Sequence, residues 1–154
     1  MIKIIPAIDI INGHCVRLSQ GDYQRITDYS ESPAAMAENF EALGFKRLHV
    51  VDLDGARSGK VINIKALKEI TSRTNLIVDF GGGIKSEEDL KNVFEAGASA
   101  VSIGSIAVSD PDIVSLWADS FGAEKFIISA DVRDNIVRTN GWTKDSGITL
   151  NQLI

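Results

Sequence analysis

Several features are scarce in this sequence, and each scarcity excludes a class of protein. Cys15 is the only cysteine and cannot form an internal disulfide, so we expect a reducing cytoplasm. No apolar run approaches the length of about 18 residues that a membrane-spanning helix needs. The net charge of −5, with no cluster of Lys or Arg, argues against a nucleic-acid partner. His14 and His49 have no further ligand at metal-like spacing, so we predict no metal site and interpret His49 as a packed or hydrogen-bonded strand residue.

What the sequence does contain is a regular alternation of short β-branched runs with longer amphipathic ones. We predict strands at 2–9, 47–53, 76–80, 100–104 and 126–131, and helices at 33–44, about 63–73, 87–96 and 111–120. The strand runs are apolar throughout, as parallel strands are when both of their faces are covered. The pattern therefore predicts the α/β class, with helices packed on a parallel sheet.

Two passages resemble each other, "IIPAIDIINGHCVR" at 4–17 and "FIISADVRDNIVR" at 126–138. In each, an apolar run ends in an aspartate, a polar turn follows and a Val-Arg pair comes next. Asp9 aligns with Asp131 at an offset of 122 residues, although a chance match is the alternative. A true repeat predicts a single domain over 1–154, made of a first half at about 1–122 and the start of a second half at about 123–154. We therefore expect the sequence to be the N-terminal part of a longer protein.

Two parallel architectures fit this pattern, an open doubly wound sheet and a closed (β/α)8 TIM barrel. No G-x-G-x-x-G follows the first strand, whereas glycine-rich turns end two strands and lone aspartates end two others. Functional groups at the C-terminal ends of many strands are typical of a barrel. We predict the barrel, with this chain holding the N-terminal half-barrel, the fifth strand and the loop after it. Such a piece would leave sheet edges and apolar surface open, so we expect it to self-associate.

The glycine triplet at 81–83 is the most informative local motif. Glycines let a backbone approach an anion closely, and a helix capped by Ser86 would add the positive end of its dipole. A tight turn that merely needs positive φ is the alternative, and it explains one glycine more easily than three. A second glycine turn ends the next strand. The candidate phosphate-binding residues are therefore Gly81, Gly82, Gly83, Lys85, Gly104 and Ser105.

Asp9 and Asp131 are the candidate catalytic residues. On strands one and five of a barrel they would lie across its mouth, where one carboxylate can act as acid and the other as base if their pKa values differ. An aspartate at a strand end can instead cap a helix or form an Asx turn, which is the alternative for each. Arg17 and Trp142 follow these strands and suit a phosphate and a planar heterocycle, although either could be a surface or core residue.

A set of ordered motifs identifies a family that the chain resembles. "IIPAIDIINGHCVRLSQGDY", "LHVVDLDGARSGK", "VDFGGGIKSEED", "IGSIAV" and "NGWTKDSGITL" closely resemble the family of phosphoribosylformimino-aminoimidazole carboxamide ribotide isomerases of histidine biosynthesis. The resemblance covers the whole chain. The related cyclase fits less well, because its first strand typically ends Cys-Leu-Asp where this sequence has Ala7-Ile8-Asp9. A bifunctional phosphoribosyl isomerase of the same fold remains an alternative, as does an inactive phosphate-binding half-barrel fragment.

The resemblance implies a barrel of two similar halves, each with a phosphate site, that binds a bis-phosphorylated small-molecule substrate. The implied reaction is an Amadori rearrangement of an aminoaldose to an aminoketose, without metal or organic cofactor. By the same resemblance, Asp9 is the general base at sugar C2 and Asp131 is the general acid at the ring oxygen. The turns at 81–83 and 104–105 correspond to the first phosphate site.

Overall fold

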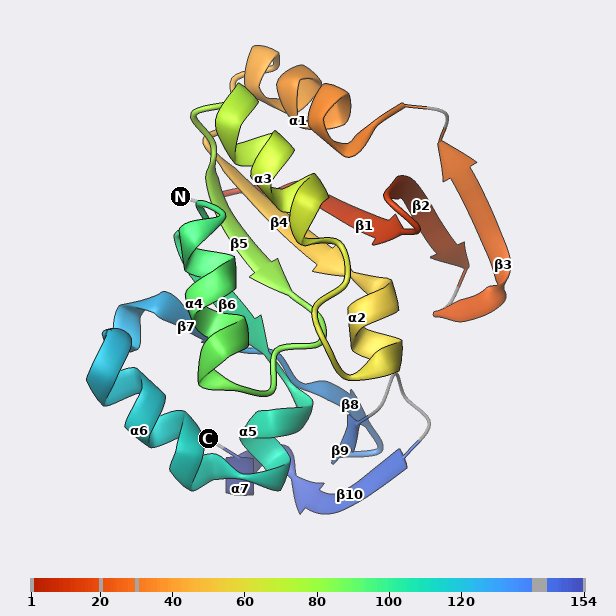
Figure 1. Cartoon of the computed structure of the whole chain (residues 1–154). Helices are drawn as coiled ribbons and strands as arrows, with labels where there is room; N and C mark the ends of the chain where they lie inside the picture. Colours follow the sequence, from red (N-terminus) through yellow and green to blue (C-terminus); the bar gives the residue numbers. More distant parts are fainter. Residues whose placement is uncertain (1, 20, 30, 140–143, 154) are drawn as a thin grey trace.

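A computed structural model of the chain describes residues 2–19, 21–29, 31–139 and 144–153 (Figure 1). A seven-stranded sheet has the order β3-β2-β1-β4-β5-β6-β7. Its strands are β1 (Ala7–Ile11), β2 (His14–Ser19), β3 (Asp22–Tyr29), β4 (Arg47–Asp52), β5 (Ile77–Gly81), β6 (Ala100–Ile103) and β7 (Phe126–Ile128). A three-stranded antiparallel sheet, β10-β9-β8, contains β8 (Asp131–Arg133), β9 (Ile136–Thr139) and β10 (Lys144–Thr149).

Four longer helices connect the parallel strands, and shorter helices lie between them. The longer helices are α1 (Pro33–Ala42), α3 (Ile64–Arg73), α4 (Glu87–Glu95) and α6 (Pro111–Phe121). The shorter ones are α2 (Leu53–Ser58), α5 (Ser105–Ser109), η1 (Ala123–Lys125) and α7 (Leu150–Leu153). Two of the longer helices have serine caps: Ser32 accepts a hydrogen bond from Ala35 N, and Ser86, whose cap was predicted, forms a capping box with Asp89. No helix in the described ranges is long and apolar enough to cross a membrane.

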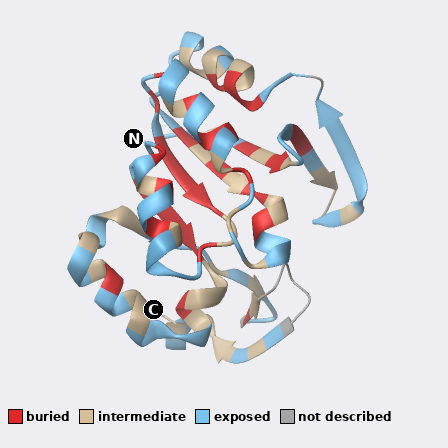
Figure 2. Ribbon diagram, viewed as in Figure 1, coloured by how far each residue is buried: buried red, intermediate tan, exposed pale blue. Residues whose placement is uncertain are grey.

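The winding of the sheet is that of a barrel. Strands β1, β4, β5, β6 and β7 pair in parallel and in sequence order, without the reversal of strand order that defines a doubly wound sheet. The longer helices all contribute to one core cluster on one face of the sheet, with Leu48, Phe80, Val101 and Leu90 among its buried members (Figure 2). The predicted α/β class is therefore confirmed, and the barrel is not closed within the described residues.

The opposite face of the sheet carries the side chains that alternate with this core. Residues of β1 and β4 alternate between buried and partly exposed positions, which puts Asp9 and His49 on the face away from the helices. The register places Asp9 beside Val51, and His49 beside Asp79 of β5. The structure therefore gathers polar groups on this second face, which we call the inner face.

Two predicted strands differ clearly from the observed ones, and β1 also continues two residues past Asp9, to Ile11. The first strand, predicted at 2–9, begins only at Ala7. Its partner β4 starts at Arg47, and the first hydrogen bond between the two strands joins His49 N to Pro6 O. Within the described ranges, the residues before this bond have no partner strand, and Ile2 is 92% exposed. Strand 126–131 ends at Ile128, because its neighbour β6 ends at Ile103, whose carbonyl accepts the last bond from Ser129 N.

An antiparallel hairpin after β1 was not predicted. Asn12 (φ 51°) and Gly13 (φ 79°) form the turn between β1 and β2, with both residues in the left-handed region that a two-residue type I′ turn requires. The hairpin continues into β3, so β1 has β2 on one side and β4 on the other. The loop after the first strand is therefore an ordered extension of the sheet.

Candidate active site

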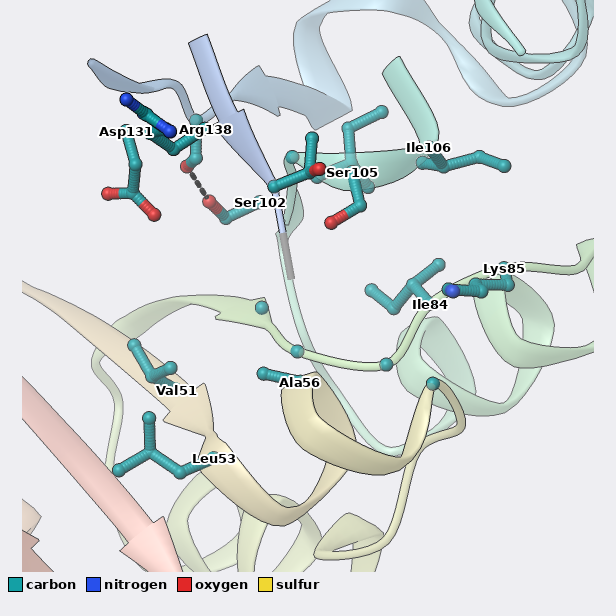
Figure 3. Close-up of a pocket in the computed structure, with 18 of the residues that line it drawn as sticks. Val51, Leu53, Ala56, Ile84, Lys85, Ser102, Ser105, Ile106, Asp131 and Arg138 are labelled. Atoms are coloured by element: carbon teal, nitrogen blue, oxygen red, sulfur yellow. Dashed lines mark hydrogen bonds between the residues drawn. The ribbon is translucent and has the colours of Figure 1, made fainter. Parts of the chain in front are cut away.

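A cavity of about 370 Å³ lies at the C-terminal ends of the parallel strands (Figure 3). Most of the predicted phosphate-binding residues line it together: Gly81, Gly82, Gly83, Lys85, Gly104 and Ser105. Asp131 lines the same cavity, whereas Asp9 and Arg17 do not. Val51, Leu53 and Ala56, from β4 and α2, form an apolar wall across from Asp131. The cavity thus combines two backbone turns, one carboxylate and one apolar surface.

The glycine triplet is required by the protein's own packing. Gly82 and Gly83 have φ of 107° and 82°, which L side chains rarely adopt. A Cβ on Gly82 would overlap the Asp52 carbonyl oxygen, and a Cβ on Gly83 would lie 2.5 Å from the Lys60 carbonyl oxygen. Gly81 is buried, and its Cβ would lie 3.0 Å from the Ser102 carbonyl oxygen. The tight-turn alternative therefore accounts for these glycines by itself, and the resulting turn still faces the cavity.

The N-terminus of α4 is already occupied by carboxylate. Lys85 N and Ser86 N donate to Asp89 Oδ2 at 3.1 and 2.9 Å, and Glu87 and Glu88 add two acidic residues in the first turn. These groups offset the positive end of the helix dipole. The expectation that α4 would attract an anion through its dipole is therefore not supported, and Lys85 is the cation that this segment contributes to the cavity wall.

The second glycine turn lies beside the first. Gly81 of β5 is in register with Ser102 of β6, so the segments that follow the two strands emerge side by side. Ser105 and Ile106 are the first residues of α5 and line the cavity. The first N–H groups of a helix have no acceptor within the helix, so this turn can donate to a bound group.

A buried carboxylate holds the neighbouring loop in place. Asp52, 0% exposed, caps α2 by accepting from Gly55 N at 2.8 Å. It also accepts from Ile62 N at 2.7 Å, from Asn63 N at 2.8 Å and from Asn63 Nδ2 at 2.6 Å. Each carboxylate oxygen thus receives two donors, which satisfies a buried charge. The loop from α2 to α3, against which the glycine triplet packs, is fixed by this residue.

Asp131 faces an arginine that the sequence analysis did not select. In β8 and β9, Asp131 is in register with Arg138, and the two side chains lie side by side in Figure 3. In the first hairpin the corresponding partner of Asp9 is Val16, so Arg17 falls one position further along β2. A shift of one residue moves a side chain to the other face of a strand. Arg138 therefore lines the cavity, while Arg17 does not.

The two candidate catalytic aspartates lie in different surroundings. Partial desolvation raises the pKa of Asp131. Burial also raises the pKa of Asp9, and a protonated His49 nearby would offset only part of that increase. Asp9 lines a second cavity of about 450 Å³ with Arg17, although its neighbours on β4, His49 and Val51, line the first. The expected arrangement of both carboxylates in one cavity is therefore not observed.

Two further predictions concern Trp142 and the absence of a metal site. Trp142, predicted to contact a planar heterocycle, lies outside the described residues. Over the ranges that are described, no group of three or more His, Cys, Asp or Glu side chains could hold a metal ion.

Comparison with known proteins points to one family. Residues 3–154 match the family described as Histidine biosynthesis protein. The chain is 55% identical over 150 residues to a 1-(5-phosphoribosyl)-5-((5-phosphoribosylamino)methylideneamino) imidazole-4-carboxamide isomerase from Bacteroides thetaiotaomicron, covering 97% of this chain and 63% of that protein. Proteins of the same name from Bacteroides fragilis and Cytophaga hutchinsonii are 56% and 49% identical, with 61% and 64% of their lengths covered. The chain thus spans less than two thirds of the length of these relatives.

Proposed function

The chain belongs to the histidine biosynthesis protein family, and from this premise we propose that it acts in the isomerisation for which its relatives are named. The substrate is a bis-phosphorylated aminoaldose, and the product is the aminoketose. The observation that carries the proposal is the single cavity that joins two adjacent backbone turns to Asp131 at the C-terminal edge of parallel strands. In barrel enzymes this edge holds the active site.

The turns after β5 and β6 bind one phosphate of the substrate. Ser105 N–H, the Ser105 hydroxyl and the Lys85 ammonium are donors suited to its oxygens, and all belong to residues that line the cavity. Arg138 lies across the cavity beside Asp131 and can pair with a further anionic group. The apolar wall of Val51, Leu53 and Ala56 fits the uncharged part of the substrate.

The chemistry is a proton transfer between two carboxyl groups and the sugar. Asp131, with its pKa raised, is suited to hold a proton and to donate it to the ring oxygen as the ring opens. Asp9, in its ionised form, then removes the proton from C2 as the general base. The electrons of the C2–H bond form a C1–C2 double bond while the C1–N π electrons move to the nitrogen, and the resulting enaminol tautomerises to the aminoketose.

The test is turnover of the aminoaldose by a protein that contains this chain. Asp9→Asn and Asp131→Asn should each lower kcat by about 10² to 10⁴ fold, because each removes a positioned acid or base. Asp134→Asn is the matched control, since Asp134 lies in the exposed turn after β8 and should leave kcat unchanged. Near-normal turnover in both active-site variants would exclude the assigned roles.

The proposal extends to cell compartment and to assembly. A biosynthetic enzyme with one reduced thiol, Cys15, belongs in the cytoplasm. The 154-residue chain exposes Ile127 and Ile128 of the terminal strand β7, by 37% and 48%, and should therefore associate with a second copy. Sedimentation at micromolar concentration tests this, and a stable monomer would contradict it.

A further inference from the structure

A hydrogen-bonded pair of side chains crosses the inner face just below the cavity. His49 of β4 and Asp79 of β5 are in register on adjacent parallel strands, and His49 Nδ1 is bonded to Asp79 Oδ2. The Asp79 side chain is 5% exposed and the His49 side chain 33% exposed. An ionised carboxylate only accepts, so Nδ1 carries the proton of this bond. The second ring nitrogen, Nε2, is then the free atom of a partly exposed ring that lines the cavity.

The pair contributes little to holding the two strands together. Five consecutive residue pairs already join β4 to β5, from Arg47 with Ile77 to Val51 with Gly81. One side-chain hydrogen bond adds only a little stability to such a ladder, because both groups are hydrogen-bonded to water in the unfolded chain. A buried carboxylate whose partner opens onto a cavity is instead the arrangement that orients a histidine for contact with a ligand.

The His49–Asp79 pair lies at a distance from the glycine turn that a sugar phosphate can span. Asp79 lies two residues before Gly81 on the same strand, which corresponds to about 7 Å along a parallel strand. A phosphate held at the glycine turn would therefore place its attached sugar at the level of the His49 ring. Asp9 lies on the neighbouring strand β1, in register with Val51, and borders the second cavity.

We propose that Asp79 is a positioning residue that fixes the His49 ring with Nδ1–H toward its carboxylate, so that Nε2 accepts a hydrogen bond from a hydroxyl of the phosphorylated sugar. This inference rests on the proposed function, because it uses the same cavity and the same class of ligand. It adds a contact to the sugar that neither the phosphate turns nor the two catalytic aspartates supply.

The first test reads the tautomer directly. The chain has two histidines, so ¹⁵N NMR of the imidazole nitrogens can be assigned with a His14→Gln variant. Wild type should show His49 with the proton on Nδ1. Asp79→Val, which removes the acceptor and suits a strand, should abolish this preference, while Asp79→Asn should retain it through the amide oxygen. His14 is exposed on β2 and serves as the internal control. A His49 tautomer that is the same in wild type and Asp79→Val would overturn the positioning role.

The second test separates this inference from the proposed function. Inorganic phosphate and ribose 5-phosphate are titrated into wild type, Asp79→Val and His49→Phe. The variants should bind ribose 5-phosphate about tenfold more weakly, the effect of one lost hydrogen bond, and should bind inorganic phosphate as wild type does. Equal affinity for ribose 5-phosphate in all three proteins, with phosphate binding intact, would overturn the inference alone. No binding of either ligand to wild type would overturn the phosphate site of the proposed function and this inference with it.

Discussion

Replacing Asp52 by asparagine should strongly destabilise the protein, although the two side chains have nearly the same shape. Asp52 is fully buried, and each of its oxygens accepts from two donors, Gly55 N and Asn63 Nδ2 on one side and Ile62 N and Asn63 N on the other. An asparagine offers one oxygen and one NH2 group, so whichever way it turns, two buried donors face another donor.

The magnitude follows from those two lost bonds. A buried N–H group left without an acceptor costs about 1 to 3 kcal/mol, so Asp52→Asn should lower the free energy of unfolding by about 2 to 6 kcal/mol. This is a large part of the roughly 5 to 15 kcal/mol that stabilises a typical domain. The free energy can be measured by urea denaturation, followed by tryptophan fluorescence and circular dichroism.

Asp54→Asn is the matched control, two residues along the chain. Asp54 accepts from Asn12 N at 2.6 Å and from Asn63 Nδ2 at 2.9 Å, both through Oδ2. An asparagine whose oxygen takes that place keeps both bonds, so the loss should stay below about 1 kcal/mol. Equal losses in the two variants would refute the reasoning, since the same charge is removed in each.

Three further predictions follow from the same contacts. Gly82→Ala should lower the free energy of unfolding by at least about 3 kcal/mol in urea denaturation, because the new Cβ would combine a positive φ with overlap on the Asp52 carbonyl. Gly13→Ala is the control, since it has the strain of a positive φ alone and should cost about 1 kcal/mol. Burial raises the pKa of Asp9 in the folded state, so ionised Asp9 lowers the stability above the folded-state pKa and has no such effect below the pKa of the unfolded chain. Asp9→Asn should therefore stabilise the protein by less than about 1 kcal/mol at about pH 7 and by nothing at about pH 3. Equal effects at both pH values would contradict this. Burial, with Glu31 and Asp28 nearby, raises the pKa of Cys15 to about 11, so a thiol reagent at about pH 8 should label it only after unfolding, and rapid labelling of the native protein would disprove this.

The parts of the fold that the sequence predicted are those governed by local periodicity and caps. The apolar runs around Val50, Phe80 and Val101 are buried strands, and the Ser32 and Ser86 caps begin helices where expected. The hairpin after β1 could also have been predicted, because Asn12-Gly13 between two apolar runs is a strong signal for a type I′ turn.

The parts that could not be predicted depend on contacts between distant segments. Nothing local to Gly82 indicates that the Asp52 carbonyl lies against it, so the three glycines suggested a ligand although packing alone accounts for them. The choice between Arg17 and Arg138 depends on a register difference of one residue between two hairpins. The pairing of His49 with Asp79 likewise arises only once β4 and β5 are aligned.

Asn63 joins three loops by hydrogen bonds, so these loops can be exchanged with those of a relative only together. Its amide group donates to both Asp52 and Asp54, and its Oδ1 accepts from Gly13 N in the turn after β1. Asp54 in turn accepts from Asn12 N. A loop grafted alone from a relative would leave donors of the remaining loops without acceptors, at a cost for each buried one. Chimaeras that exchange the β1–β2 turn, the start of α2 and the segment before α3 together should fold, whereas chimaeras that exchange one of these loops should express poorly. In protein design, the three segments should therefore be replaced together.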